Sequence, residues 1–293
     1  MPAAAAAPLL IADVPWLLYR AYFGLPRSIV GADGEPVNAL LGTINALLAV
    51  MEERSARAVV ACLGAEEASY RVELYPAYHA HREPMPAELR AQWLKAPALL
   101  ESLGWAVCDG GELEADDAMF SHARAEAEAG GQALLLTADR DLFQAVDEHV
   151  TIAELTKGRL AGEIGRLQVR ERYHGIEPEQ VTDLIALRGD PSDGLPGAPG
   201  IGVKRAAELL LRYGSLEDVL TAASSDAHGL RPRASAVLNE HAELLRIFKR
   251  IATLQRIDVR RPPNRVTDFE AGARAARELG MRGLAERLEG MAA

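Results

Sequence analysis

Short apolar segments alternate with longer amphipathic segments in the first half of the chain. Residues 9–13, 58–63, 105–108 and 133–137 form four apolar runs with the length and composition of buried strands. Residues 38–53 repeat their apolar positions with helical periodicity. Strands that alternate with helices predict an α/β fold, in which a mostly parallel twisted sheet is joined by right-handed crossovers and flanked by helices.

Acidic residues follow three of these four runs, near the edge where the carboxyl ends of parallel strands meet. They are Asp13, then Glu114, Asp116 and Asp117 at the start of a helix expected over residues 118–129, and then Asp139 and Asp141. Like charges about 4 Å apart repel by roughly 1 kcal/mol in water and roughly 4 kcal/mol near a protein surface. The helix dipole alone can explain acids in a first helical turn. Their recurrence at three strand ends instead favours a site for hard divalent cations, which take carboxylate oxygens.

The segment between the second and third runs, residues 70–100, interleaves basic and aromatic side chains. It contains Tyr70, Arg71, Tyr75, Tyr78, His79, His81, Arg82, Arg90, Trp93 and Lys95. This mixture suits phosphate contacts and base stacking on a single-stranded nucleic acid. A solvated pair of helices with tyrosines in its core would explain the same pattern, so this segment does not decide the function alone.

A glycine-rich segment follows at residues 183–214. Its first loop contains Asp190 and Asp193, and the run Pro-Gly-Ala-Pro-Gly-Ile-Gly-Val-Lys occupies residues 196–204. Glycines let a backbone approach a phosphate closely, and the next helix presents free N–H groups to it. The segment therefore predicts a helix-hairpin-helix that binds nucleic-acid backbone, although a lone Gly-x-Gly would only indicate a capped helix. Its candidate contacts are Gly200, Gly202, Lys204 and Arg205.

The composition is that of a globular chain. Its 293 residues, 49% of them hydrophobic, suffice for one large domain or two small ones. The net charge of −10 argues against a nucleic-acid partner, unless the acids gather in a metal site and the bases elsewhere. Cys62 and Cys108 fit no zinc spacing and indicate a reducing compartment. No basic leader occurs in residues 1–8 and no apolar run is long enough to span a membrane, so we expect a cytoplasmic protein without membrane contact.

Together these segments resemble the bacterial 5′-nucleases, the flap endonuclease and 5′–3′ exonuclease family that includes the N-terminal nuclease domain of DNA polymerase I. The resemblance covers about residues 9–220. It rests on the run that ends at Asp13 with Leu18-Tyr19-Arg20-Ala21-Tyr22, on Tyr70-Arg71 through His79 to Arg82, on Glu114-Ala115-Asp116-Asp117, on Thr137-Ala138-Asp139-Arg140-Asp141, and on Gly189-Asp190-Pro191-Ser192-Asp193 with the hairpin. Since no polymerase domain follows, we expect the free-standing form.

The resemblance implies a PIN-like α/β core over residues 1–180 with a helical arch at about residues 70–98. A helical subdomain over residues 181–293 would carry the helix-hairpin-helix at about 183–214 and be integrated with the core. The implied partner is DNA with a 5′ flap, a nick or a 5′ end, and an RNA primer is a second candidate. The implied oligomeric state is a monomer.

The resemblance also implies roles for individual residues. Asp13, Glu114 and Asp116 would hold a first Mg²⁺ or Mn²⁺, and Asp117, Asp139, Asp141, Asp190 and Asp193 a second. Arg71, His79 and Arg82 would be catalytic residues in the arch, through which single-stranded 5′ flaps pass. Arg20, Tyr70, Gly200, Gly202, Lys204 and Arg205 would contact DNA, with K⁺ on carbonyl groups of the hairpin.

Two positions depart from the family pattern. Gly64 stands where the second strand of the family ends in an aspartate ligand, and His79 replaces an arch lysine. Glycine supplies no ligand, and an imidazole with a pKa of about 6.5 is mostly neutral at pH 7. Three explanations remain open: Glu66 or Glu67 replaces the missing carboxylate, the remaining ligands with water support a slower enzyme that favours Mn²⁺, or catalysis is lost and flap binding is kept. If the first metal site is impaired, Gly64→Asp should raise the rate.

A different metal-dependent nuclease of the same α/β type, such as a toxin-like ribonuclease, is the structural competitor. The hairpin and the long arch argue against it, because those small domains lack both.

Overall fold

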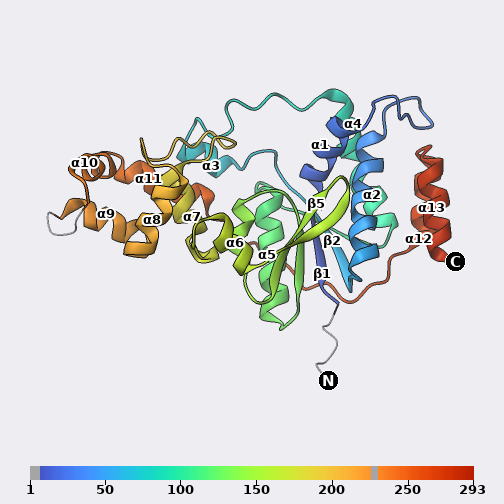
Figure 1. Cartoon of the computed structure of the whole chain (residues 1–293). Coiled ribbons are helices and arrows are strands. Elements are labelled where there is room, and N and C mark those ends of the chain that lie inside the picture. The colour runs from blue at the N-terminus through green and yellow to red at the C-terminus, as the bar shows by residue number, and fades with distance from the viewer. Residues whose placement is uncertain (1–6, 226–229) are drawn as a thin grey trace, which may run out of the picture.

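A six-stranded sheet forms the centre of the molecule (Figure 1). The computed structural model describes residues 7–225 and 230–293. The strands are β1 (Leu9–Asp13), β2 (Ala58–Leu63), β3 (Ala106–Asp109), β4 (Ala133–Leu136), β5 (Val150–Thr156) and β6 (Arg159–Ile164). They lie in the order β3-β2-β1-β4-β5-β6, and each neighbouring pair is parallel except β5–β6. The prediction of a mostly parallel sheet is therefore confirmed.

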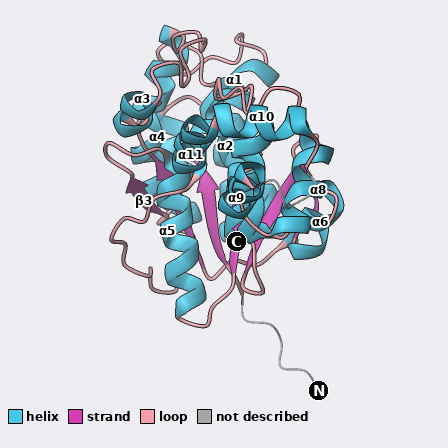
Figure 2. Ribbon diagram, turned by 90° about the vertical axis from the view of Figure 1, so that its left-hand side faces the viewer, coloured by secondary structure: helices cyan, strands magenta, loops and turns pink. Residues whose placement is uncertain are grey.

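Helices cover both faces of the sheet (Figure 2). One face packs against α1 (Val14–Gly24), α2 (Asn38–Glu53), α4 (Ala87–Ser102), α12 (Phe269–Glu278) and α13 (Arg282–Ala292). The other packs against α5 (Ala115–Glu128) and the short helix η1 (Asp141–Ala145). The remaining helices are α3 (Ser69–Leu74), α6 (Arg166–Arg172), η2 (Pro178–Gln180), α7 (Val181–Arg188), α8 (Val203–Tyr213), α9 (Leu216–Ser224), α10 (Pro232–Glu240) and α11 (Ala242–Ala252).

Strand β1 is buried on both faces, which fixes the direction of the acid at its end. Leu9 and Ile11 pack into the core on the α5 side, whereas Leu10 and Ala12 pack into the core on the α1 side. Successive side chains of a strand point to opposite faces. Asp13 therefore continues the row of Leu9 and Ile11 towards the α5 side.

The strand order places a crevice between β1 and β4. From β1 the chain winds outwards to β2 and β3, then returns past β1 to form β4. Connections leave the carboxyl ends of β1 and β4 in opposite directions, and ligands of open α/β sheets bind in the crevice that results. Asp13 and the loop at residues 137–141 lie at this point.

The predicted elements are confirmed, with small shifts at their boundaries. Residues 38–53 and 58–63 form α2 and β2 as predicted. The helix expected over residues 118–129 begins earlier, at Ala115. Asp117 Oδ2 accepts the backbone N–H of Glu114 at 3.2 Å, and this bond caps the first turn.

The antiparallel hairpin of β5 and β6 was not predicted. Its two strands are joined at Lys157 and Gly158, whose φ angles are 51° and 78°. Two-residue hairpins of this kind need positive φ at both central positions, which Asn-Gly usually supplies. The Lys-Gly pair is therefore a weak signal in the sequence.

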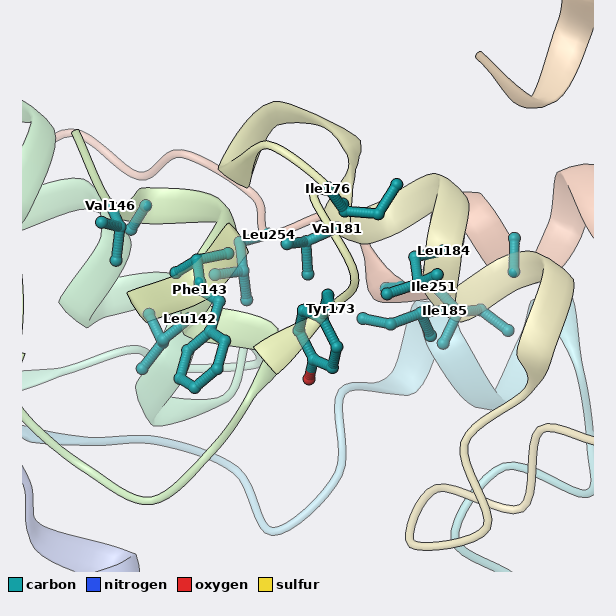
Figure 3. Packing of buried hydrophobic residues seen from close by; sticks show 14 of the residues in the cluster. Leu142, Phe143, Val146, Tyr173, Ile176, Val181, Leu184, Ile185, Ile251 and Leu254 are labelled. Atoms are coloured by element: carbon teal, nitrogen blue, oxygen red, sulfur yellow. The ribbon is translucent and has the colours of Figure 1, made fainter. Parts of the chain in front are cut away.

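The helical part shares a hydrophobic core with the sheet (Figure 3). The cluster joins Leu142 and Phe143 of η1 to Ile185 of α7 and Ile251 of α11. Continuous packing of this kind couples the two parts of the chain mechanically. The domain boundary near residue 180 stays a prediction.

Membrane contact was excluded from the sequence. No helix within residues 7–225 and 230–293 combines the length and the apolar composition that crossing a membrane requires. The absence of a leader was inferred from residues 1–8, of which residues 1–6 lie outside the described residues.

A buried carboxylate on α5 binds two arginines, one of which belongs to the segment between α11 and α12. Glu126 of α5 is fully buried and accepts hydrogen bonds from Arg57 Nε at 3.0 Å and from Arg261 Nε at 2.8 Å. Arg57 Nη1 also donates to the carbonyl of Pro262 at 2.7 Å. The segment between α11 and α12, which carries Arg261 and Pro262, runs past the lower side of the core in Figure 1. It thus links the helical part to α12 and α13.

Replacing the buried carboxylate should destabilise the fold. Glu126→Ala leaves the guanidinium of Arg57 without its carboxylate partner, and we expect the free energy of unfolding to fall by about 3 kcal/mol. Urea unfolding followed by circular dichroism measures the change. Glu128→Ala is the matched control, because it removes only an exposed pair with Arg256 and should change little. Equal effects of the two substitutions would contradict the role of Glu126.

Candidate active site

The crevice at the carboxyl end of the sheet opens into a cavity of about 1180 Å³. Seven of the eight predicted ligand acids line it: Asp13, Glu114, Asp116, Asp139, Asp141, Asp190 and Asp193. Acids from four distant parts of the chain therefore share one cavity. Asp117, the eighth predicted ligand, does not line the cavity.

Thr137 connects two of the acids at the switch point. Its hydroxyl donates to Asp13 Oδ2 at 2.7 Å and accepts the backbone N–H of Asp139 at 3.0 Å. Asp13 Oδ1 accepts the N–H of Trp16 at 2.9 Å and so caps α1. Burial raises the pKa of the Asp13 carboxyl to about 6, although the bonds from Trp16 and Thr137 oppose the shift. This role of Thr137 was not predicted from the sequence. The signal for it is weak, namely a hydroxyl side chain two residues before Asp139.

Asp116, Asp139 and Asp141 are half-buried in the cavity, where their charges act on one another. Burial, then the charges of Asp139 and Asp13, raise the pKa of Asp116 well above its usual range. Burial raises the pKa of Asp139 to about 7, and burial and the charge of Asp139 raise the pKa of Asp141. Asp116 Oδ1 is buried and has no hydrogen-bond partner within the described part of the chain. Repulsion among these carboxylates therefore adds to the cost of burying them.

The donor atoms fit a hard divalent cation. The acids that line the cavity offer carboxylate oxygens, which Mg²⁺ and Mn²⁺ prefer. Within the described residues, no three Asp, Glu, His or Cys side chains converge tightly enough to form a ready-made metal site. Repulsion between carboxylates favours side chains that stand apart from one another. Because the structure defines no set of converging ligands, the assignment of individual ligands stays a prediction.

Arg71 is buried and paired with two acids, so it is not an exposed residue of the arch. It lines the cavity but is only 3% exposed. Its Nη1 lies 3.0 Å from Glu114 Oε1, its Nη2 lies 2.9 Å from Asp117 Oδ1, and its Nε donates to the carbonyl of Ile251 at 3.1 Å. With three protein partners, its guanidinium serves to hold Glu114 and Asp117 in place.

Glu114 and Asp117 are further engaged by neutral donors. Tyr78 Oη donates to Glu114 Oε1 at 3.0 Å, and the N–H of Ala68 donates to the same oxygen at 2.9 Å. The N–H of Gln255 donates to Asp117 Oδ1 at 2.7 Å. Asp117 therefore links α3, α5 and the segment after α11, and we leave it out of the proposed ligand set.

Asp190 and Asp193, on the loop after α7, lie in the cavity next to basic side chains. His79 Nε2 lies 3.1 Å from Asp193 Oδ1, and Arg82 Nη2 lies 3.3 Å from the same atom. The backbone N–H of His79 also donates to the carbonyl of Asp193 at 3.1 Å. Asp190 pairs with Arg188 at 2.9 Å. His79 and Arg82 thus line the cavity, and both contact an acid, while their catalytic role stays a prediction.

Gly64 packs directly against the start of α5. A β-carbon on Gly64 would lie 2.4 Å from the carbonyl oxygen of Leu113 and 2.8 Å from the nitrogen of Ala115. The N–H of Ala65 donates to that Leu113 oxygen at 2.9 Å, which keeps the two backbones together. An aspartate could not project from this position unless the backbone moved. This packing corrects the expectation that Gly64→Asp restores a ligand.

Glu66 and Glu67, the candidate replacements for the missing ligand, line the same cavity as the acids. Glu66 already has a partner, because its carboxylate pairs with Arg90 at 3.0 Å and both side chains are exposed. The structure therefore offers no support for Glu66 as a substitute ligand.

The predicted helix-hairpin-helix is formed by α7, the loop at residues 189–202 and α8. Gly189 and Gly197 have φ angles of 78° and 66°. A β-carbon on Gly189 would lie 2.4 Å from the carbonyl oxygen of Leu195, and one on Gly197 would lie 2.2 Å from the nitrogen of Gly189, so the loop is closed tightly. Gly200 and Gly202 lie on the open surface, where a β-carbon on either residue would meet no described atom within 4 Å. Backbone there is free for close contact with a ligand.

The other predicted DNA contacts lie outside the acidic cavity. Lys204 and Arg205 line a second cavity of about 470 Å³, together with Arg231. The guanidinium of Arg20 lies 5.8 Å from the ring centre of Trp16. The guanidinium of Arg71 lies 5.1 Å from the ring centre of Tyr70.

Comparisons with known proteins agree with this geometry. Residues 8–174 match the family model described as 5'-3' exonuclease, N-terminal resolvase-like domain, and residues 176–270 match the model described as 5'-3' exonuclease, C-terminal SAM fold. A 5'-3' exonuclease of Mycobacterium tuberculosis is 34% identical over 310 residues, covering 96% of each chain. A 5'-3' exonuclease of Streptomyces coelicolor is 35% identical and covers 83% of this chain and 84% of the relative. DNA polymerase I of Thermus thermophilus is 35% identical over 96% of this chain, which spans 32% of that protein.

Solved structures share the fold. The flap endonuclease of bacteriophage T5, in a complex with DNA and metal ions, has a TM-score of 0.67 at 19% identity and covers 97% of this chain and 99% of its own. The 5'-exonuclease of phage T5 with bound zinc has a TM-score of 0.65 at 20% identity, with 96% of both chains covered. At such low identity these likenesses concern the fold alone. The two family models together with the bacterial relatives show that this chain belongs to the 5′–3′ exonuclease family.

Proposed function

We propose that this protein is a structure-specific 5′ nuclease, a flap endonuclease or 5′–3′ exonuclease that hydrolyses phosphodiesters of branched or 5′-ended DNA with divalent cations. The observation that carries this proposal is the shared cavity at the switch point, which seven carboxylates line. Relatives named 5'-3' exonuclease, similar over most of their length, support the same activity. The fold is that of a flap endonuclease studied with DNA and metal ions.

The proposed cations are Mg²⁺ or Mn²⁺. Asp13, Asp116, Asp139 and Asp141 are the first candidates to hold them, because Arg71, Arg82 and Arg188 pair with Glu114, Asp193 and Asp190. Divalent cations at such a site activate a water molecule and stabilise the charge of the displaced oxygen. The protein's own contribution is to hold the acids at the switch point and to keep Asp13 oriented through Thr137 and Trp16.

DNA binding is proposed to depend on surfaces outside the acidic cavity. Carboxylates repel phosphates, so affinity must come from basic groups and free backbone N–H groups elsewhere. The hairpin with Gly200, Gly202, Lys204 and Arg205 is the candidate site for duplex, with K⁺ on its carbonyl groups. Arg82, 48% exposed at the cavity, is the candidate contact for the unpaired 5′ strand. We propose a monomer that acts in the cytoplasm, with an RNA primer as a second candidate strand.

A flap-binding protein without catalysis is the second candidate function. The tight packing of Gly64, which leaves no room for a side-chain ligand, is the observation that favours it. Seven acids nevertheless line the cavity, so we place the enzyme first.

Metal dependence separates the two candidates. On a 5′-flap DNA we expect cleavage with Mg²⁺ or Mn²⁺ and none with a chelator, because the buried acids need cations before a phosphate can approach. Gel analysis of a labelled flap measures the products. Tight, salt-dependent flap binding without cleavage in either metal would instead identify a binding protein.

Removing one buried acid should affect cleavage more than binding. Asp139→Ala deletes a carboxylate of the cavity, and we expect the cleavage rate to fall at least about a hundredfold while flap affinity stays the same or rises. Single-turnover rates and fluorescence anisotropy measure the two quantities. Asp258→Ala, on an exposed position outside the cavity, is the control and should change neither. A parallel loss of binding and cleavage would mean that Asp139 serves folding.

Adding a side chain at Gly64 should impair the protein. Both Gly64→Ala and Gly64→Asp force the loop away from Leu113 and Ala115, so we expect lower melting temperatures and slower cleavage. Gly283→Ala, at a helical site with open space around it, is the matched control and should be tolerated. A faster Gly64→Asp variant would show that the backbone adapts and that a ligand was missing.

A further inference from the structure

The two cysteines of the chain lie side by side at the carboxyl edge of the sheet. Cys62 of β2 and Cys108 of β3 are register partners in parallel strands, and Asp13 of β1 is the register partner of Cys62 on its other side. Partners in register on parallel strands point to the same face of the sheet. Both cysteines accordingly pack against the core on the α5 side. The two thiols therefore form one row with Asp13, the acid at the switch point.

The spacing of the two cysteines suits a disulfide, although both are free in this structure. Neighbouring strands lie about 4.8 Å apart, and disulfides join α-carbons that are about 4.4–6.8 Å apart. Burial, and then the charge of Cys108, raise the pKa of Cys62 well above its usual range, which agrees with neighbouring sulfur atoms. Strand β3 has four residues and lies at the end of the sheet order, so it can make the small adjustment that the bond requires.

The two thiols differ in their access to solvent. Cys62 is fully buried, so neither a bulky reagent nor a second protein molecule reaches its sulfur. Cys108 is half-buried, so an oxidant in solution meets it first. Burial raises the pKa of the Cys108 thiol, so the reactive thiolate is scarce and sustained exposure to the oxidant is needed. Cys108 is then the partner that lies next to Cys62.

We propose that Cys62 and Cys108 form a reversible disulfide when a peroxide oxidises the protein, and that this bond slows phosphodiester cleavage. The Cys108 sulfur attacks one peroxide oxygen, the O–O bond breaks, and a sulfenic acid and a water molecule are formed. The Cys62 sulfur then attacks the sulfur of the sulfenic acid, so that an S–S bond forms, the S–O bond breaks and a second water molecule leaves. The two thiols together lose two electrons and two protons, and the peroxide is reduced to water.

The segments that follow β2 and β3 connect the pair to the acidic cavity. Gly110 donates its N–H to the carbonyl of Leu63 at 2.8 Å. Ala65 donates its N–H to the carbonyl of Leu113 at 2.9 Å. Gly64 lies against the start of α5 without room for a β-carbon. A bond that shifts β2 or β3 therefore also shifts the start of α5, whose acids line the cavity.

Thiol counting tests the bond without reference to nuclease activity. The protein is treated with hydrogen peroxide, unfolded and alkylated with iodoacetamide, and its peptides are analysed by mass spectrometry. We expect a monomer in which neither of the two cysteines is alkylated and the peptides that carry Cys62 and Cys108 are joined. Dithiothreitol should return both thiols to the alkylated form.

Cys108→Ser separates the thiol pair from other oxidation. This variant keeps the same six methionines, so any effect of methionine oxidation appears in both proteins. After the peroxide is removed, we expect the unaltered protein to cleave a 5′-flap DNA at least about tenfold more slowly, because small shifts of catalytic groups are costly. Dithiothreitol should restore the rate, and Cys108→Ser should keep its own rate throughout. Melting temperatures check that both proteins are folded.

Two results would overturn the proposal. One is a treated protein in which Cys62 stays open to alkylation while Cys108 is oxidised alone or joined to a second molecule. The other is a disulfide-bonded protein that cleaves as fast as the reduced protein. The effect on cleavage rests on the proposed nuclease function, whereas the bond does not. If the reduced protein cleaves no flap, the nuclease function and the effect on cleavage fall together, and the thiol count still decides the bond.

Discussion

Repulsion between buried carboxylates is the constraint on which the rest of the site depends. Asp116, Asp139 and Asp141 lie where solvent screening is weak, and their raised pKa values record how unfavourable their charges are to one another. A fold tolerates such a cluster only when its packing holds the acids in place and something else offsets their charge. The sheet supplies the first requirement, because β1 is buried on both faces and sits at the switch point. Divalent cations can meet the second requirement, because they bind carboxylate oxygens and offset their charge.

The protein pairs four of the acids with its own basic side chains. Arg71 joins Glu114 and Asp117, His79 and Arg82 contact Asp193, and Arg188 pairs with Asp190. The contacts of Arg71, His79 and Arg82 span elements that are separate in sequence, so they also fix how those elements sit relative to one another. The acids divide into a group that pairs with basic side chains of the protein and a second group, Asp13, Asp116, Asp139 and Asp141, for which no such pair is found among the described residues. This division explains why residues that look alike in the sequence differ in role.

The same division explains how an acidic protein can act on DNA. A net charge of −10 would repel a polyanion if it were spread evenly over the surface. Here many acids are gathered in one cavity or paired with arginines, while the hairpin offers open backbone and basic side chains. In the function that we propose, binding and chemistry are therefore assigned to different surfaces.

Hydrophobic patterning is a local property, so the amino-acid order alone was enough to predict β1 to β4, a mostly parallel sheet and the acids at strand ends, but not the hairpin of β5 and β6. It could not separate Asp116 from Asp117, since neighbours on a helix point about 100° apart and only the packed structure shows which one meets Arg71. It could not place Arg71, whose partners include Ile251, 180 positions away. It also could not reveal that Gly64 touches the start of α5 or that Thr137 holds Asp13. Those roles depend on which atoms lie opposite each side chain, and that is decided only when distant segments pack together.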